Sequence, residues 1–367
     1  MDRKDMYWYY ILPIKFIGNV TEIIKSEGID DFQKSYSEIV LERENSDFCI
    51  RLSRDWFLHI EVKWLEQELD EMDRLDDQMK WDGYFAITKK HIHYLNALNL
   101  LIASEYKNAI QDNDKLIRLV GEFDIQKLDN TNVVRYVYDN RGVHMDTKMN
   151  TYTKYIQENR YWLHHKNGLP LEFQMSHYGS LYIPFFKNAF DKFLSITEYS
   201  RIKLMSHMVD CITEYKEWNF AQSFILAWFF IESYIWDNIW KRYLESLQWT
   251  EVWDPRINSD RKKFLTRDKQ FSISWVLEFC ELLELIPTEE YKKLNKFRKQ
   301  RNTLIHWFVS DEENLTQEDV YSILSYALSK LSVIINNDLR FNYRVHCLNH
   351  SSSCIPKRHY TGPSISH

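Results

Sequence analysis

The strongest constraint on the fold is a helical hydrophobic periodicity that runs from about residue 180 to residue 337. Apolar residues recur there at intervals of three and four, which places them on one face of an α-helix. Such patterns lie around 199–215, 220–246, 271–286, 288–306 and 316–335. The C-terminal half is therefore predicted to be an antiparallel bundle of about five helices.

Residues with known preferences for helix ends mark several boundaries in this half. Pro287 is predicted to end the third helix, because proline lacks the backbone N–H and clashes with the preceding turn. Thr288, followed by two glutamates, suits the start of the next helix. Thr316 and Asp319 have the spacing of a capping box and are predicted to begin the last helix.

The first part of the chain reads as mixed α and β. Residues 56–64 alternate apolar side chains (Leu58, Ile60, Val62 and Trp64) with polar ones (His59, Glu61 and Lys63), which predicts a strand with one buried face. Residues 132–139 and 6–17 are predicted as further strands. Thr88 is predicted to cap a helix whose buried face carries Ile92, Leu95, Leu98 and Ile102. The acidic run 66–82 is expected to be a solvated helix face or a loop.

A chain of 367 residues exceeds the usual size of a single core, which favours two domains. We expect an α+β domain over 1–179 with a sensor or regulatory role, a helical bundle over 180–340, and a tail over 341–367. The chain is thus predicted to be α+β first and predominantly helical in its C-terminal half.

Composition favours a cytoplasmic protein with no membrane contact. The five cysteines are odd in number and mostly far apart, which favours reduced thiols. The first residues lack the apolar stretch of a signal peptide. The most apolar segment, 224–236, is shorter than a membrane span and contains Glu232.

The stretch KKLNKFRKQRNTLIHW, residues 292–307, carries six basic side chains in its first ten positions and then the pattern R-N-x-x-x-H. The net charge of −6 hides an asymmetry, because residues 1–150 hold 20 Lys and Arg against 28 Asp and Glu, whereas the rest holds 27 against 25. A local positive patch of this kind is what phosphate binding requires.

A helical projection separates the polar residues of this stretch. Arg301 falls within the apolar arc, whereas Arg298, Asn302 and His306 share the adjoining polar arc. A buried guanidinium needs a partner, and Glu232, the lone carboxylate of the apolar segment 224–236, is the expected one. One interpretation is that this ion pair only holds the helices together. The other is that Arg301, Asn302 and His306 form a catalytic site supported by Glu232 and Arg298.

Spacing alone does not distinguish these interpretations, because an arginine followed by four to six residues and a histidine occurs at five other places. These pairs are Arg54 and His59, Arg160 and His165, Arg201 and His207, Arg340 and His346, and Arg344 and His350. The pair Arg301 and His306 differs in its context, which is an adjacent asparagine, a preceding basic run and a penultimate helix.

In that context the chain resembles the HEPN superfamily of ribonucleases, whose R-x4-6-H motif lies in an all-helical bundle. The resemblance covers roughly 180–337 and rests on Arg301, Asn302 and His306 after the basic KFRKQ, with an acid upstream in LAWFFIESYI. It implies a metal-independent endoribonuclease with Arg301 and His306 as the catalytic pair. It also implies a bacterial toxin or an antiphage, abortive-infection effector.

Because one chain carries one such motif, the resemblance implies a homodimer with a shared cleft, and products with 2′,3′-cyclic phosphate and 5′-hydroxyl ends. RNA, including tRNA, is the expected partner, and an antitoxin or a phage-derived trigger is a further one. The RNA backbone is expected to follow Lys292, Lys293, Lys296, Arg298 and Lys299, with Arg261, Lys262 and Lys263 as weaker candidates. The alternatives are a solvated lysine face, a catalytically inactive HEPN-like module that binds RNA or protein, and a purely structural bundle.

No cofactor or metal is expected. Cys347, His350, Cys354 and His359 in the tail have ligand types that suit zinc, but their spacing matches no common zinc motif. The histidines of 89–94 and 162–168 lack a convincing acidic or cysteine partner, and 73–78 lacks the glycine and the terminal glutamate of a calcium loop.

Overall fold

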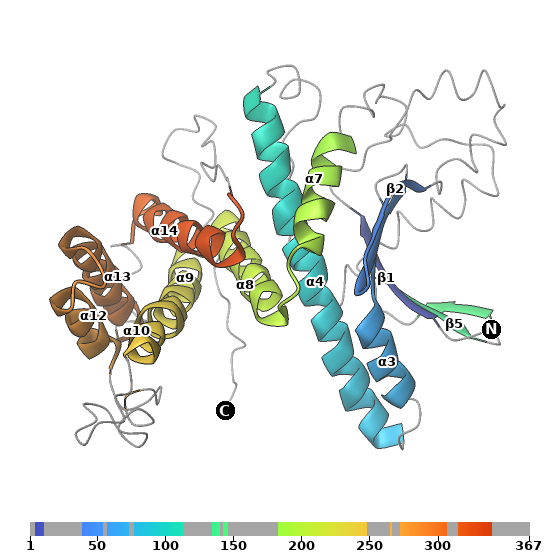
Figure 1. The fold of residues 1–367 in the computed structure, drawn as a ribbon, viewed down its shortest axis with the longest axis horizontal. Coiled ribbons are helices and arrows are strands. Elements are labelled where there is room, and N and C mark those ends of the chain that lie inside the picture. The colour runs from blue at the N-terminus through green and yellow to red at the C-terminus, as the bar shows by residue number, and fades with distance from the viewer. Residues whose placement is uncertain are drawn as a thin grey trace, which may run out of the picture.

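The computed structural model describes residues 4–10, 39–53, 57–72, 77–112, 134–139, 142–145, 183–247, 265, 272–306 and 315–339. For some residues in these ranges it describes the backbone only, among them His306 and the strands β1 (Lys4–Tyr10), β5 (Val134–Asp139) and β6 (Gly142–Met145). Figure 1 shows a sheet at one end of the molecule and the C-terminal helices at the other. The predicted cysteine and histidine tail site lies outside the described residues.

The described strands form one antiparallel sheet in the order β2-β3-β4-β1-β5-β6. Strands β2 (Ile39–Glu44), β3 (Phe48–Ser53) and β4 (Phe57–Val62) are consecutive, whereas β1 lies between β4 and β5. In this register Tyr7 of β1 is opposite Ile60 of β4 and Arg135 of β5. The strands predicted within 6–17, 56–64 and 132–139 are confirmed where the structure describes them.

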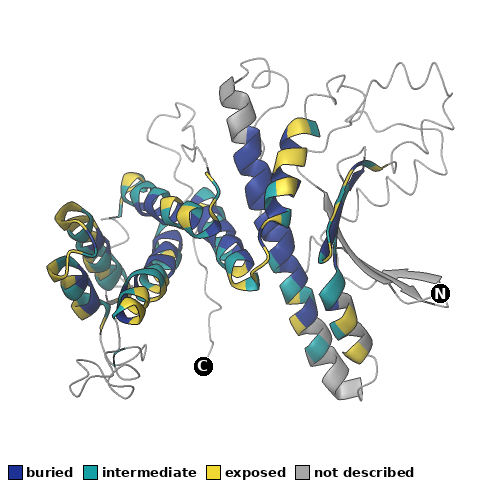
Figure 2. Cartoon of the chain, in the orientation of Figure 1, coloured by how far each residue is buried: buried dark blue, intermediate teal, exposed yellow. Residues whose placement is uncertain are grey.

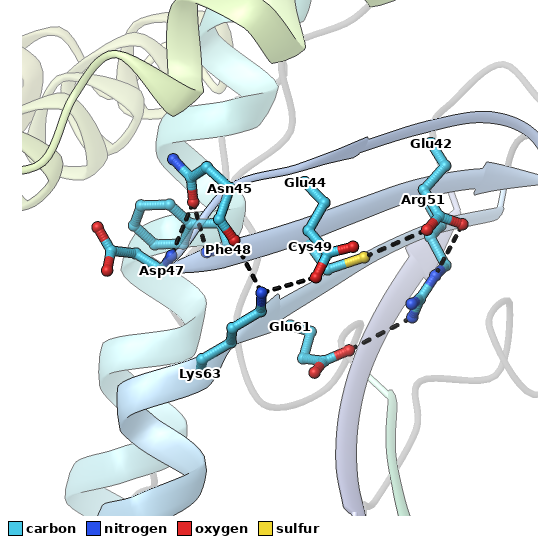
Figure 3. A network of polar contacts seen from close by, with 9 residues as sticks. All are labelled: Glu42, Glu44, Asn45, Asp47, Phe48, Cys49, Arg51, Glu61 and Lys63. Atoms are coloured by element: carbon cyan, nitrogen blue, oxygen red, sulfur yellow. Dashed lines mark hydrogen bonds and ion pairs between the residues drawn. The ribbon is translucent and has the colours of Figure 1, made fainter.

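The turn between β2 and β3 is closed by an asparagine side chain. The Oδ1 atom of Asn45 accepts hydrogen bonds from the backbone N–H groups of Asp47 and Phe48, both at 2.8 Å (Figure 3). Asparagine favours such turns because its short side chain reaches the backbone two residues on. The turn places Phe48 at the start of β3, where its ring is buried beside Tyr94.

Strand β4 confirms the predicted buried face but corrects the opposite one. Leu58, Ile60 and Val62 are fully buried, as predicted, yet His59 is fully buried as well. The reason is that β4 is an interior strand, and Arg51 of the neighbouring β3 reaches over it with Nη1 3.4 Å from Nδ1 of His59. Burial, and then the charge of Arg51, lower the pKa of His59 to about 3, so the ring is neutral at physiological pH.

Two helices follow the sheet strands, α3 (Lys63–Met72) and α4 (Asp77–Asp112). Trp64 therefore belongs to a helix and not to the predicted strand. The predicted cap at Thr88 is also wrong, because α4 begins at Asp77 and passes through that position without a break. Ile92, Leu95, Leu98 and Ile102 are buried, as predicted.

Helix α4 is buried on several faces because it packs against α3, α7 (Ile183–Leu194) and α8 (Tyr199–Lys216) (Figures 1 and 2). Two of its buried polar side chains bond to those helices. Lys192 of α7 donates to Glu105 at 2.6 Å, and Asn96 donates to Ser206 of α8 at 3.3 Å. Apolar residues of the sheet region and of the C-terminal helices join in one core through these contacts.

The predicted C-terminal helices are present. Helix α9 (Phe220–Tyr234) continues through a π-helical segment, η3 (Ile235–Trp240), into α10 (Lys241–Ser246). Helices α12 (Ile273–Leu282), α13 (Thr288–His306) and α14 (Gln317–Ile335) follow. An α+β N-terminal region followed by a helical C-terminal half is thus confirmed. The boundary predicted at 179/180 stays a prediction, since residues 146–182 are outside the described ranges.

The ends of these helices agree with the sequence in part. The capping box of Thr316 and Asp319 is present at the start of α14. Helix α13 begins at Thr288, as predicted, and the hydroxyl of Thr288 donates to Glu281 of α12 at 3.1 Å. Helix α12 ends before Pro287 and leaves Trp275 and Leu282 largely exposed, although both belong to its predicted apolar pattern. None of the described helices combines the length and the apolar content needed to cross a lipid bilayer.

Candidate functional site

Helix α13, which carries the basic stretch, is fixed to α14 near its first turn. The carboxylate of Glu290 accepts hydrogen bonds from the Tyr326 hydroxyl and, at 2.7 Å, from the ammonium group of Lys330. That ammonium also lies 5.0 Å from the centre of the Tyr326 ring and 5.6 Å from that of Tyr234 on α9. Burial alone would raise the pKa of Glu290, but the bonds from Lys330 and Tyr326 outweigh it and lower the pKa. A polar clamp therefore sets the position of α13 against α14 and α9.

The second attachment of α13 is the N-terminal turn of α14. Lys296 donates to Asp319 at 3.0 Å, and Gln300 also donates to this carboxylate. Burial opposes ionisation of Asp319, but the bonds from Thr316, Gln300 and Lys296 lower its pKa to about 2. The carboxylate that caps α14 thus also holds one edge of the basic face of α13.

Arg301 lies against α9, on the side where the projection placed it. Its guanidinium carbon is 5.7 Å from the centre of the Phe229 ring, and its Nε atom is buried with no hydrogen-bond partner. Its Nη1 atom donates to Oδ1 of Asn302 at 3.1 Å. The aromatic face and the amide orient the guanidinium without supplying a negative charge to compensate it.

The predicted ion pair between Arg301 and Glu232 is wrong. Glu232 instead accepts a hydrogen bond of 2.9 Å from the indole N–H of Trp228, one turn earlier on α9. Among the described residues no carboxylate forms an ion pair with Arg301. The interpretation of Arg301 as one half of a structural ion pair required this partner and therefore loses its support.

Arg298 is oriented in a similar way. Its Nε and Nη2 atoms donate to Oδ1 of Asn295 at 3.1 and 2.8 Å. Asn295 in turn donates to the Tyr291 hydroxyl at 3.4 Å, and that hydroxyl donates to Glu278 of α12. The bond to Glu278, and then burial, raise the pKa of Tyr291, so it stays a hydrogen-bond donor. Neither Tyr291 nor Asn295 was predicted as a site residue, although Asn295 lies on the polar arc of the projection and Tyr291 continues that arc at helical spacing.

The two arginines of α13 differ from three other described arginines in the groups that accept their hydrogen bonds. Arg43, Arg51 and Arg201 each form an ion pair with a carboxylate. Arg298 and Arg301 are bound by asparagines, which are neutral acceptors. The C-terminal half of α13 therefore keeps a positive charge that ion pairs remove elsewhere.

The four lysines predicted to bind RNA fall into different environments. Lys292 pairs with Glu289 and Lys296 with Asp319, at 2.7 and 3.0 Å. The ammonium of Lys293 lies over the rings of Phe297 and Tyr326, toward α14. Lys299 is exposed, and within the part of the chain that the structure describes its ammonium has no partner. Lys299 is thus the lysine best placed to bind an external anion.

An open pocket of about 390 Å³ lies along α13, on the side that carries Lys292, Lys296 and Lys299. Its lining residues are Tyr291, Lys292, Asn295, Lys296, Lys299 and Gln300. The Oε1 atom of Gln300 is buried there without a hydrogen-bond partner. Of the three lysines on this lining, Lys292 and Lys296 are paired, so the pocket offers an anion the ammonium group of Lys299.

His306 is the last residue of α13, and its side chain lies outside the described ones. The helical register places it on the same face as Asn302, one turn earlier. Arg301, Asn302 and the His306 position are therefore gathered at the C-terminal end of one helix. Of the weaker candidates, Arg261, Lys262 and Lys263 lie outside the described residues.

A separate cluster on the sheet also brings together groups of metal-ligand type. The carboxylates of Glu42 and Glu44 and the sulfur of Cys49 offer atoms within 4.8 Å of one another (Figure 3). Arg51 already pairs with Glu42, however, and Lys63 pairs with Glu44 at 2.7 Å. Burial raises the pKa of the Cys49 thiol to about 11, which disfavours the thiolate that a metal needs. We therefore assign no metal to this cluster.

The chain was also compared with known proteins. Family models, curated proteins and solved structures all gave no match. The residues of α13 therefore carry the functional conclusion.

Proposed function

We propose that the protein is a HEPN-type endoribonuclease whose active site is built on Arg301, Asn302 and His306. One observation carries this proposal: the guanidinium of Arg301 is oriented by Asn302 and by the Phe229 ring but neutralised by no carboxylate of the described chain. A structural arginine in a half-buried position is normally paired. An oriented, uncompensated one suits the binding of a phosphate.

The chemistry of RNA cleavage fits these residue types. A base removes the proton of the ribose 2′-hydroxyl, and the resulting oxyanion attacks the adjacent phosphorus. The bond from phosphorus to the 5′-oxygen then breaks, and an acid donates a proton to that oxygen. The products are a 2′,3′-cyclic phosphate and a 5′-hydroxyl.

Each residue has a role in this reaction. Imidazole titrates near neutrality, so His306 is suited to one of the two proton transfers. The guanidinium of Arg301 stabilises the charge on the phosphorane. Asn302 holds that guanidinium, with an Nη1 to Oδ1 distance of 3.1 Å.

The proposal includes a homodimer. One chain supplies one motif, whereas the reaction needs both an acid and a base, so a second copy completes the cleft. Two exposed apolar residues lie near Arg301. Phe229 of α9 contacts it through its ring, and Ile305 of α13 follows it by four residues in the sequence. The biological role that we propose is that of a cytoplasmic antiphage or toxin effector, regulated through the N-terminal region.

The decisive experiment is RNA cleavage in EDTA by wild type, His306→Ala and Arg301→Ala, with folding checked by circular dichroism. We expect cleavage by wild type, cyclic-phosphate ends, and a loss of at least about 100-fold in each variant. Cleavage that survives both substitutions, or that EDTA abolishes, contradicts the mechanism. A monomer by light scattering at the assay concentration contradicts the shared site.

A second function has an observation of its own in its favour. Lys299 and Arg298 lack carboxylate partners among the described residues, and this holds whether or not His306 is catalytic. These charges support RNA binding without cleavage. Salt-sensitive RNA binding by a wild type that cleaves nothing would favour this RNA-binding module.

A further inference from the structure

A continuous polar stripe runs along α13 beyond the residues assigned to cleavage. Tyr291, Asn295, Arg298, Asn302 and His306 follow one another at intervals of four and three, which keeps them on one face of the helix. Hydrogen bonds connect its first half, from the Tyr291 hydroxyl through Asn295 to Arg298. The stripe therefore extends the candidate site toward the N-terminal end of α13.

Arg298 is held more firmly than an ordinary surface arginine. Two of its nitrogens, Nε and Nη2, donate to a single acceptor, Oδ1 of Asn295. Asn295 is itself fixed by the Tyr291 hydroxyl, which is bonded to Glu278 on the neighbouring α12. The guanidinium is thus pre-organised through two helices, while Nη1 has no bond to any described residue.

The amide at position 295 determines how much positive charge remains at Arg298. An aspartate there would orient the same nitrogens but would cancel their charge. Asparagine orients Arg298 and leaves the full positive charge for an external group. Lys299, whose ammonium has no partner among the described residues, adds a second cation beside it on the lining of the pocket.

The position of Arg298 separates it from the reacting phosphate. It lies eight residues before His306, which is about 12 Å along the helix axis. Arg301 lies only about 7.5 Å from His306 on the same measure. A chain of several nucleotides along this face would reach Arg298 with a phosphate that is not being cleaved.

We propose that Arg298 binds a non-scissile backbone phosphate of single-stranded RNA, and that Asn295 is the residue that positions it. This inference rests on the ribonuclease function proposed above. It makes the protein selective for polynucleotide chains, because part of the binding energy comes from phosphates outside the cleaved bond. Arg298 thus acts in substrate binding, whereas Arg301 and His306 act on the reacting atoms.

The test pairs protein variants with a chemically altered RNA. The substrate is a short single-stranded RNA that wild type cleaves, in which one phosphate at a time, other than the scissile one, is replaced by a neutral methylphosphonate. We expect one position at which wild-type kcat/KM falls about tenfold. Arg298→Gln should show the same loss on unmodified RNA and little further loss at that position.

Asn295→Asp tests the positioning role. It should keep the fold and the orientation of Arg298, yet lower kcat/KM about as much as Arg298→Gln does. The slope of log affinity against log salt should fall by about one in both variants. Gln222→Glu is the matched control for the added negative charge, because it is exposed on α9, and Arg201→Gln is the control for a lost arginine.

The outcomes separate the two proposals. Cleavage of RNA by wild type but not by His306→Ala supports the ribonuclease function. If, in that case, the losses of kcat/KM from Arg298→Gln and from the methylphosphonate are additive at every position, the role of Arg298 is overturned and the ribonuclease function stands. Full activity of Asn295→Asp on RNA overturns the positioning role. A wild type that neither cleaves nor binds RNA overturns both proposals.

Discussion

The guanidinium carbon of Arg301 lies 5.7 Å from the centre of the Phe229 ring, across the contact between α13 and α9. A cation over an aromatic face is attracted by the ring quadrupole, typically by about 0.5–2 kcal/mol. The ring stabilises the arginine without supplying a negative charge, so this contact leaves the positive charge of Arg301 in place. This contact replaces the ion pair that the sequence suggested.

Replacing Phe229 by leucine should therefore weaken the orientation of Arg301. The substitution keeps apolar volume but removes the ring, and we expect RNA cleavage to fall by about two- to fivefold. Phe220→Leu, at the other end of α9 and away from Arg301, is the matched control. Equal rates for the Phe229 variant and wild type would show that the ring does not position the arginine.

The energetic coupling between Arg301 and Glu232 should be close to zero. Because no ion pair joins them, a double-mutant cycle with Arg301→Ala and Glu232→Gln should give a coupling below about 0.5 kcal/mol in the free energy of unfolding. Chemical denaturation of the four proteins provides this value. A coupling of about 2 kcal/mol or more would instead restore the structural ion pair.

Glu290→Gln should loosen the clamp between α13 and α14. The variant loses the ion pair with Lys330, and we expect a loss of about 1–3 kcal/mol in the free energy of unfolding. Because the pKa of Glu290 is lowered on folding, its stabilisation is complete above its unfolded pKa, near 4.5, and is lost as pH falls through the lower folded value.

The difference between wild type and Glu290→Gln should accordingly be constant near pH 7 and shrink below about pH 4.5. Glu289→Gln is the control, since its pair with Lys292 is exposed and should change stability by less than about 1 kcal/mol. A pH-independent difference would show that the carboxylate charge does not stabilise the clamp.

Asp319→Asn should destabilise the start of α14. The pKa of Asp319 falls from 3.8 to about 2 on folding, which corresponds to about 2 kcal/mol at neutral pH. This contribution is present above pH 4 and disappears as the pH falls through about 2. Thermal unfolding measured between pH 2 and pH 7 tests it. Glu318→Gln, at the exposed neighbouring position, is the control for the loss of a surface carboxylate.

Lys299→Gln should weaken RNA binding more than Lys296→Gln. Lys299 has no partner among the described residues, whereas Lys296 is held by Asp319. We expect the slope of log affinity against log salt to fall by about one for Lys299→Gln. Lys187→Gln on α7 is the control for a lost exposed lysine. Identical slopes for all three variants would remove Lys299 from the interface.

The sequence by itself determined the helices of the C-terminal half and much of the stripe on α13. Helical periodicity is a local property. Spacing alone therefore predicted the buried faces of α8 and α14, the capping box at Thr316 and the place of Arg301 on the apolar side of its helix. The face shared by Arg298, Asn302 and the His306 position follows from the same geometry.

Only the tertiary structure decided which groups meet across elements. His59 is buried because β4 is an interior strand, and α4 is buried on several faces because α3, α7 and α8 pack against it. Arg301 meets Phe229 and not Glu232 because the facing residue of α9 depends on how the two helices pack. Such pairings join residues far apart in the chain, and local spacing carries no information about them.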